Sequence, residues 1–227
     1  MMFRIIIWIS LLFSFAISKT DKAEHFNFQY NLKKYDELRV IFDCSIGNLV
    51  VKPSTDRYYI NGDVQYNALM PKPNLKFSNK NNVAKLDFVI NPKGTDINSN
   101  ALNSLINKGN DNYVINFFMP KKISTDLKLD FGLGKVDLDF SGLRVTGLVM
   151  DCGFSDVNMR NEKPNIVKCD NISISTGVSD FNSSSLGNFN ASKYYFDVGA
   201  GSAQIDMSGS ANRDTKVKID VTLGSLE

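Results

Sequence analysis

The second half of the chain repeats one short pattern of apolar and polar residues. The segments LDFGLGKVDL, from Leu129, and MDCGFSDVNM, from Met150, alternate apolar and polar residues, pass through small residues, and then alternate again. Strict alternation predicts a β-strand with one buried face. Because the alternation shifts by one residue at the small residues, we expect a corner there with the apolar side kept inward. In this interpretation Leu133 and Phe154 still face the core.

The pattern occurs six times, and from the second copy onward the steps are 21, 24, 22 and 23 residues. Steps of this length are typical of stacked repeats. One such rung cannot bury its inner face alone, so rungs must stack. The sequence therefore predicts an all-β fold, a stacked β-solenoid like a single-stranded β-helix, with rungs of 21–24 residues. A β-sandwich of repetitive hairpins is the alternative. The central small residues are Ser45, Gly132, Gly153, Gly177, Gly199 and Thr222, and the residues expected in one continuous core include Phe131, Cys152, Val198 and Val221.

The chain divides into four parts by pattern. Residues 1–18 are predicted to be a signal peptide, and 19–35 a polar lead-in whose FNFQYNL segment is a candidate first strand. Residues 36–120 form an N-terminal β region with one clear copy of the repeat, and 121–227 form the regular repeat region. Within the N-terminal region, residues 91–112 are a polar insertion with at most a short helical turn, and long loops of this kind commonly carry function.

The first residues are typical of a secretory signal peptide. Arg4 precedes an apolar run from Ile5 to Ile17, and the small residues Ala16 and Ser18 mark two cleavage points. The apolar run is too short, and too often interrupted by serine, to be typical of a membrane-spanning helix. An uncleaved membrane anchor is the alternative. We expect an exported protein.

The three cysteines raise the question of disulfide bonds in an exported chain. Cys44 and Cys152 occupy the core position of the repeat, whereas Cys169 falls in a turn region outside it. We expect buried free thiols, since free cysteine is among the most buried residue types. A bridge between Cys44 and Cys152 would require their rungs to be neighbours.

The sequence offers little support for catalysis or cofactor binding. The formal net charge is +2 and no run of Lys or Arg is present, which argues against nucleic acid as a partner. His25, in the lead-in, is the single histidine, so histidine-based triads and zinc sites lack support. The GLGK segment at 132–135 lacks the rest of a phosphate-binding loop. We predict no catalytic residue, no cofactor and no enzyme.

A column of acidic residues follows from the repeat. If rungs stack, the polar residues of the first strands align at about 4.8 Å per step, and bare like charges at that distance repel. One hypothesis is calcium binding by carboxylates, with Asp130, Asp151, Asp197 and Asp220 as candidate ligands. The alternative that we favour is that each Asp accepts a hydrogen bond from the backbone N–H two residues on. Lys128, Lys218 and solvent would then relieve the charge. The full column is Asp43, Asp130, Asp151, Ser175, Asp197 and Asp220.

The segment LDFGLGKVDLDFSGLRVTGLVMDCG resembles the toast-rack family of bacterial envelope proteins, and the resemblance extends over nearly all of residues 36–227. That family is related to the C-terminal domains of LiaF-type cell-wall antibiotic-response proteins and to head-domain adhesins. The resemblance implies a stacked β fold in the periplasm or on the surface of a bacterium, with no catalytic residues to transfer. The chain lacks the multi-span membrane segment of the LiaF type, so a direct signalling role there is not expected.

Together these features predict an exported cell-envelope structural or interaction protein, adhesin-like and non-catalytic. A regulator or sensor of envelope stress that acts through a membrane partner is the alternative, and an enzyme acting on surface polymer is less favoured. The expected partner is an envelope protein or a surface polymer. The last repeat, IDVTLGSLE from Ile219, ends as an open strand, so its edge is a candidate for self-association.

Overall fold

The computed structural model describes residues 22–90 and 109–227, and this part of the chain is almost entirely β. Eleven strands form one sheet, and the described helical content is limited to two four-residue 3-10 turns. The prediction of an all-β protein is confirmed. The strands are β1 (Ala23–Asn31), β2 (Glu37–Pro53), β3 (Tyr59–Asn67), β4 (Asn74–Lys80), β5 (Val83–Ile90), β6 (Tyr113–Met119), β7 (Ser124–Asp139), β8 (Arg144–Arg160), β9 (Cys169–Ser184), β10 (Ala191–Gln204) and β11 (Lys216–Leu226), and the turns are η1 (Gly109–Asn112) and η2 (Leu186–Phe189).

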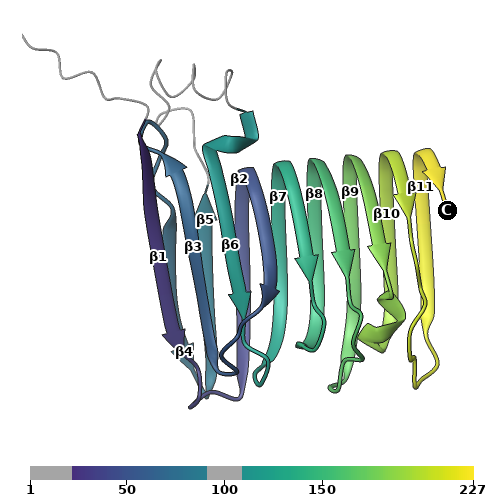
Figure 1. Cartoon of the computed structure of the whole chain (residues 1–227). Coiled ribbons are helices and arrows are strands. Elements are labelled where there is room, and N and C mark those ends of the chain that lie inside the picture. The colour runs from purple at the N-terminus through teal and green to yellow at the C-terminus, as the bar shows by residue number, and fades with distance from the viewer. Residues whose placement is uncertain (1–21, 91–108) are drawn as a thin grey trace, which may run out of the picture.

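Six strands, β2 and β7 to β11, stack side by side in parallel as the rungs of a rack (Figure 1). Each rung bends near its middle, so that its first arm lies in one layer and its second arm in the other. The register reproduces the repeat, since Leu129 lies opposite Met150 and Met150 lies opposite Ile174. The stacked-rung fold is therefore confirmed. A sandwich of hairpins would need antiparallel neighbours, so that alternative is wrong for this region.

The bend of each rung comes earlier than the sequence pattern suggested. In β7, Phe131 is buried, Gly132 and Leu133 both turn away from the core, and inward alternation resumes at Gly134. Leu133 is 42% exposed and its counterpart Phe154 is 63% exposed. The prediction that these two side chains face the core is therefore wrong.

The position that follows Leu133 and Phe154 in each rung explains why these two side chains face outward. Gly134 and Gly201 have φ values of +138° and +130°, a backbone conformation that side chains rarely allow. At Gly201 an added Cβ would overlap the carbonyl group of Ser179. Because the inside of the bend has no room for a large side chain, the apolar residue beside it points outward. The residues at this inner position are Gly47, Gly134, Ser155, Ser179, Gly201 and Gly224.

The central glycines of the repeat are required by the close stacking of successive bends. A Cβ added at Gly153 would lie 2.7 Å from the carbonyl oxygen of Gly132. A Cβ added at Gly177 would lie 2.8 Å from the carbonyl oxygen of Gly153. Backbone therefore contacts backbone from rung to rung at this point, which is a common reason for glycine within a strand.

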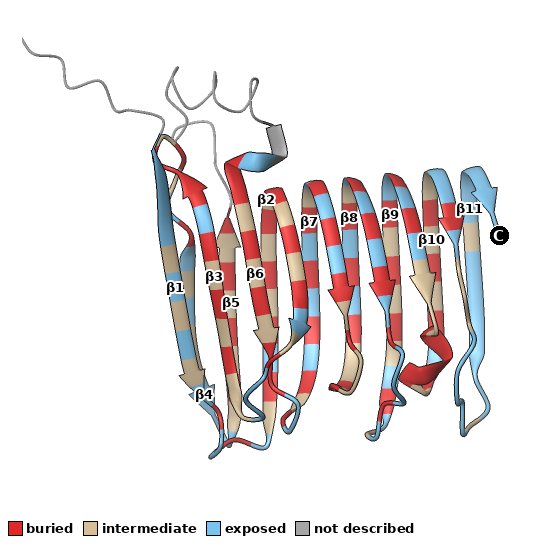
Figure 2. Cartoon of the chain, viewed as in Figure 1, coloured by how far each residue is buried: buried red, intermediate tan, exposed pale blue. Residues whose placement is uncertain are grey.

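The core fills the space between the two arms along the length of the rack (Figure 2). Phe131, Cys152 and Val198 are each at most 2% exposed, as predicted. Val221 points to the same side as Val198, its neighbour in the register, but is 37% exposed. Among the described strands, β11 pairs only with β10, so its outer side is uncovered.

The N-terminal end of the rack is built differently from the repeats. β3 pairs antiparallel with both β1 and β6, and β4 pairs antiparallel with β5. Tyr30 of β1 and Phe77 of β4 stack with their ring centroids 4.3 Å apart, and both pack against the core. His25 lies on β1 with its Nδ1 3.6 Å from an Oδ1 atom of Asp63, and its side chain is more than half exposed. Aromatic side chains thus cover the core at this end.

Two predicted segments fall outside the described residues. These are the signal peptide at 1–18 and most of the insertion at 91–112, of which the structure describes the turn η1. Among residues 22–90 and 109–227, no helix has the length and apolar character needed to cross a membrane.

The stacking of the bends gives a first testable prediction. Gly153→Ala should lower the free energy of unfolding by about 1–3 kcal/mol, because its Cβ would press on the backbone carbonyl of Gly132, which cannot move without shifting the next rung. The measurement is urea unfolding of the variant beside the wild type.

Gly147→Ala is the matched control. Its Cβ would meet Oδ1 of Asp126 at 2.8 Å, the end of a side chain that can rotate away. Equal losses of stability for the two variants would contradict the role given to the backbone contact.

Candidate functional site

A row of exposed apolar side chains runs along the bends of the rack. It occupies one position of the repeat, directly after the central glycine, and successive members lie opposite one another in the register. Its four large side chains are 42%, 63%, 49% and 74% exposed; these belong to Leu133, Phe154, Val178 and Leu223, in that order. We call this row the bend ladder, and it consists of Leu133, Phe154, Val178, Ala200 and Leu223.

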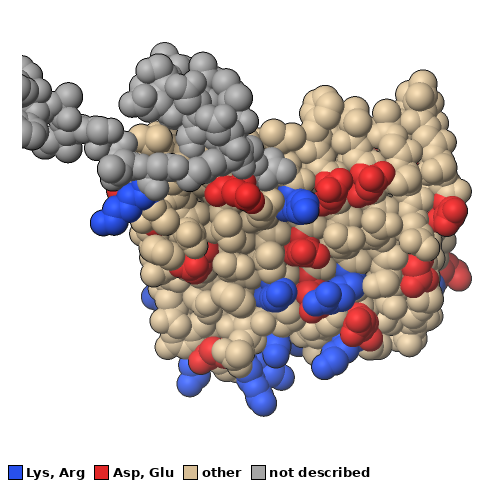
Figure 3. Space-filling model, turned by 45° about the horizontal axis from the view of Figure 1, so that its top comes forward, with Lys and Arg blue, Asp and Glu red and all other residues tan. Residues whose placement is uncertain are grey.

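The bend ladder forms a continuous apolar surface because its members are separated by single rung steps of about 4.8 Å. Figure 3 shows that the surface along the tops of the repeat rungs is largely uncharged, with most of the visible charged side chains lower on the face. Contiguous exposed apolar surface in a folded protein commonly marks an interaction site. Sequence reasoning missed it because Leu133 and Phe154 continue the apolar alternation. The sequence does contain a signal for outward-facing side chains, because each of these apolar residues lies between two small residues.

The predicted acidic column is present in the register of the first arms. Asp43, Asp130 and Asp151 lie opposite one another in three successive rungs. Ser175 interrupts the column, which resumes with Asp197 and Asp220. Two further carboxylates of like charge thus sit one rung apart at the end of the rack.

The hydrogen bonds of the column differ from those predicted. The carboxylates of Asp130 and Asp151 accept no bond from the N–H two residues on, because each strand stays extended through its bend. The prediction of a local turn at each Asp is therefore wrong. Lys218 does relieve the charge at the end of the column, with its Nζ 2.6 Å from Oδ2 of Asp220. The hydroxyl of Tyr195 lies 3.2 Å from the same oxygen.

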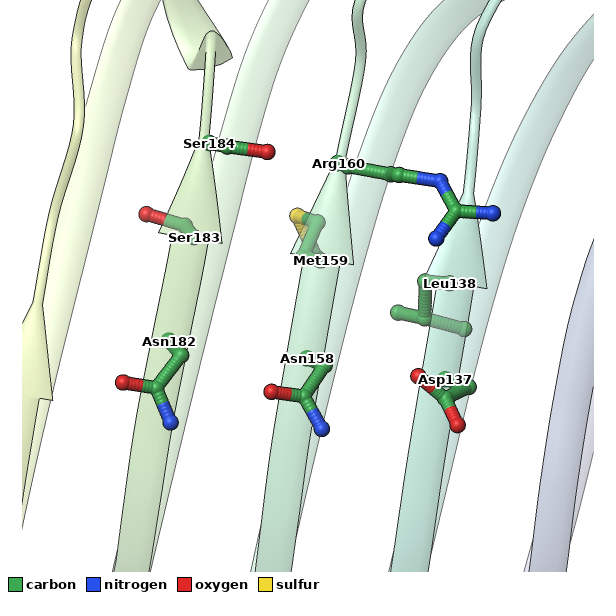
Figure 4. A pocket seen from close by; sticks show the side chains of 8 residues that line it. All are labelled: Asp137, Leu138, Asn158, Met159, Arg160, Asn182, Ser183 and Ser184. Atoms are coloured by element: carbon green, nitrogen blue, oxygen red, sulfur yellow. The ribbon is translucent and has the colours of Figure 1, made fainter.

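A shallow polar groove lies on the second arms of β7 to β9, with a volume of about 210 Å³ (Figure 4). The amides of Asn158 and Asn182 lie side by side with their oxygens on the same side. Arg160 donates to Asp139 at 2.9 Å. Burial raises the pKa of Asp139, but hydrogen bonds from Ser141 and Arg160 outweigh it and bring that pKa below its usual value. The groove offers donors and acceptors for a polar ligand.

A second, acidic groove of about 550 Å³ lies where the first arms begin. It is lined by Asp36, Glu37, Asp126 and Asp170 among others. Burial raises the pKa of Asp126, and Glu37 adds to that shift while Arg39 opposes it. Within the described residues, no three His, Cys, Asp or Glu side chains are placed together so as to hold a metal ion.

All three cysteines are buried free thiols, as predicted. Phe131 lies between Cys44 and Cys152 in the register, so these two are two rungs apart, or about 9.6 Å. This is beyond the roughly 7 Å that a disulfide spans. Cys169 is the first residue of β9 and is fully buried, so its predicted place in a turn region is wrong. Burial raises the pKa of each thiol to about 12, which leaves them unreactive near neutral pH.

A family model described as the N-terminal domain of toast_rack, DUF2154, matches residues 18–181. The chain belongs to the toast-rack family. The match extends from the residues before β1 through most of β9, and it confirms the resemblance carried by the LDFGLG segment.

One solved structure with a TM-score above 0.5 agrees with this assignment of fold. A "putative cell adhesion protein" from Clostridium sporogenes matches with a TM-score of 0.62 and 16% sequence identity, over 90% of this chain and 98% of its own. A "putative adhesin" from Bacteroides fragilis matches with a TM-score of 0.32 and 15% identity, over 89% of this chain and 96% of its own. No curated protein matches the chain. At this identity the Clostridium structure shows a shared toast-rack fold.

The acidic column gives a second prediction. Asp151→Asn should raise the free energy of unfolding by about 0.2–1 kcal/mol at neutral pH, because it removes repulsion from Asp130 in the neighbouring rung. The gain should shrink at high salt, which screens exposed charges. The measurement is urea unfolding at low and high ionic strength.

Asp137→Asn is the control, because Asp137 lies opposite Val50 and Asn158 and has no like-charged neighbour in the register. If calcium instead raised the melting temperature of the wild type and Asp151→Asn abolished that rise, the column would be a calcium site.

The buried thiols give a third prediction. Their pKa is higher in the folded chain than the ordinary 9.0, so the folded state holds protons that the unfolded chain releases. The stability that they contribute is complete below pH 9 and is lost as the pH rises toward 12. Each thiol should steepen the fall by up to about 1.4 kcal/mol per pH unit. The measurement is denaturant unfolding across this range.

Tyr66 and Tyr194 act in the same direction, since burial raises their pKa from 10.0 to about 12. The control is therefore a chain with Cys44, Cys152 and Cys169 all replaced by Ala, which should keep the part of the slope due to tyrosine. An unchanged slope in that variant would rule out the contribution of the thiols.

Proposed function

We propose that this toast-rack protein is an exported, non-catalytic interaction protein of the bacterial cell envelope, adhesin-like, which binds a protein partner through the bend ladder. The observation that carries the proposal is the exposure of Leu133, Phe154 and Val178 on three successive rungs, a row that continues through Ala200 to Leu223. Burying a large apolar side chain contributes about 1.5–3 kcal/mol, so a partner that covered several of them would gain substantial affinity.

The rack suits this role because its rungs hold the ladder in a fixed geometry. Each rung is paired on both sides along β7 to β10. A surface that is ordered before binding loses little conformational entropy on association. An adhesive protein needs a preformed contact surface of this kind and does not need mobile catalytic groups.

The wider context supports the same function. The residues 1–18 have the features of a signal peptide, which favours export. The Clostridium sporogenes protein with the same fold is named as a "putative cell adhesion protein". The apolar character of the ladder favours a protein partner over a surface polysaccharide, for which the polar groove around Asn158 and Asn182 would be better suited.

The test is retention on a bacterial envelope fraction. Protein purified from cells that express the full chain is passed over immobilised envelope proteins, beside a variant with Leu133→Ser, Phe154→Ser and Val178→Ser. We expect retention of the variant to fall by roughly tenfold or more, because each lost contact lowers the affinity. Thermal unfolding of the variant checks that the rack is intact.

The matched control replaces two exposed apolar residues outside the ladder, Val149→Ser and Ile166→Ser, which are 44% and 73% exposed in the wild type. Retention of this control should equal that of the wild type. If the ladder variant were retained as well as the wild type, the bend ladder would not be the contact surface.

A further inference from the structure

The outer side of β11 leaves the core uncovered within the part of the chain that the structure describes. β11 pairs with β10 on one side, and no other described strand pairs with its outer side, which we call the terminal edge. Its inward side chains Val217, Ile219 and Val221 are 43%, 37% and 37% exposed. Their partners in β10 are at most 2% exposed. The terminal edge therefore combines unpaired backbone groups with exposed core side chains.

The opposite end of the rack is closed in a way that the terminal edge is not. There, Tyr30 and Phe77 come from two different strands and stack across the end of the core. β11 carries small aliphatic residues at the corresponding inward positions. A bare parallel edge with an apolar face is a ready template for another strand.

The outward face of β11 carries charges of both signs. Lys218 and Asp220 lie on the same face, two residues apart, and are joined at 2.6 Å. Tyr195 of β10 supports both of them, with its hydroxyl 3.2 Å from Asp220 and its ring 5.0 Å from the Lys218 ammonium. Lysine on an edge strand discourages indiscriminate pairing. A partner strand must therefore present a carboxylate opposite Lys218.

β11 itself meets that requirement when it is reversed. In an antiparallel pair with a second copy centred on Ile219, each Lys218 faces Asp220 of the other copy. On the inward face Val217 then faces Val221, and Ile219 faces Ile219. We propose that the terminal edge binds a second copy of this chain in this register, forming a symmetric dimer.

The nearest registers on either side are disfavoured by the same residues. A pair centred on position 218 brings two Lys218 ammonium groups together, and one centred on position 220 brings two Asp220 carboxylates together. Like charges directly opposite each other destabilise a strand pair. If the symmetry axis falls between two residues, the register shifts by one residue relative to these pairs. Polar side chains of one strand then lie opposite the apolar core residues of the other. The register centred on Ile219 matches both faces at once.

Charge exchange tests the register directly. Protein purified from cells expressing the full chain is studied by sedimentation velocity over roughly a hundredfold range of concentration, because dimerisation depends on concentration. The wild type should form dimers. Lys218→Glu alone sets two carboxylates against each other, and Asp220→Lys alone sets two ammonium groups against each other. Each variant should weaken the dimer by about tenfold or more.

An equimolar mixture of these two variants should dimerise again. The new carboxylate at position 218 of one chain then faces the new ammonium at position 220 of the other, and the unchanged Asp220 faces the unchanged Lys218. Labelling one variant with a fluorophore lets its sedimentation be followed within the mixture. Recovery in the mixture separates pairing between chains from any effect within one chain, because the bond within each strand stays broken.

The control makes the same charge changes inside the rack. Lys135 and Asp156 lie opposite each other on β7 and β8, so Lys135→Glu and Asp156→Lys should leave the dimer intact. A monomeric wild type, single variants that dimerise as the wild type does, or a mixture that stays monomeric would each overturn the proposal. The inference does not depend on the partner of the bend ladder, since retention on envelope and dimer mass are measured separately.

Discussion

The contact of backbone with backbone at successive bends constrains the rest of this structure. Gly153 and Gly177 stack on the carbonyl groups of the preceding rungs so closely that a methyl group at either would collide. This contact fixes the height of each rung relative to the last. Since the side chains of a strand alternate between two faces, fixing the height also fixes which residues enter the core. The rungs differ in length between bends, and the loops between arms absorb that difference while the bends stay aligned.

A fixed register turns any single outward position into a row. One apolar residue after the central glycine becomes the bend ladder, and one aspartate becomes a column that repels itself. The same rule places Asn158 beside Asn182 in the polar groove. The protein therefore has extended linear surfaces and shallow grooves as its main features. Extended surfaces of this kind suit recognition of another macromolecule.

Most of the fold could be predicted from the sequence, because in a stacked structure each repeat of the sequence pattern forms one rung. The six repeat copies fall in register, and Phe131, Cys152 and Val198 enter the core as expected. The errors lie where local pattern and tertiary crowding disagree. Leu133 and Phe154 continue the apolar alternation, yet the inside of the bend cannot hold them. Asp130 and Asp151 have the spacing of a local turn, but the strands stay extended. Cys169 lies beside a loop in sequence and begins a buried strand, which a single sequence does not reveal.

The two ends of the rack follow from the same geometry and link the two proposals. A stack of identical rungs has no internal reason to stop, so each end needs its own solution. Antiparallel strands with aromatic rings close the N-terminal end, whereas β11 repeats the rung pattern and leaves its core face exposed. Pairing β11 with a reversed copy would extend the layer of the first arms without a new fold. It would also invert one rack relative to the other, because antiparallel strands place their bends at opposite ends. The two bend ladders of such a dimer would face opposite directions, which leaves each ladder open to a separate partner.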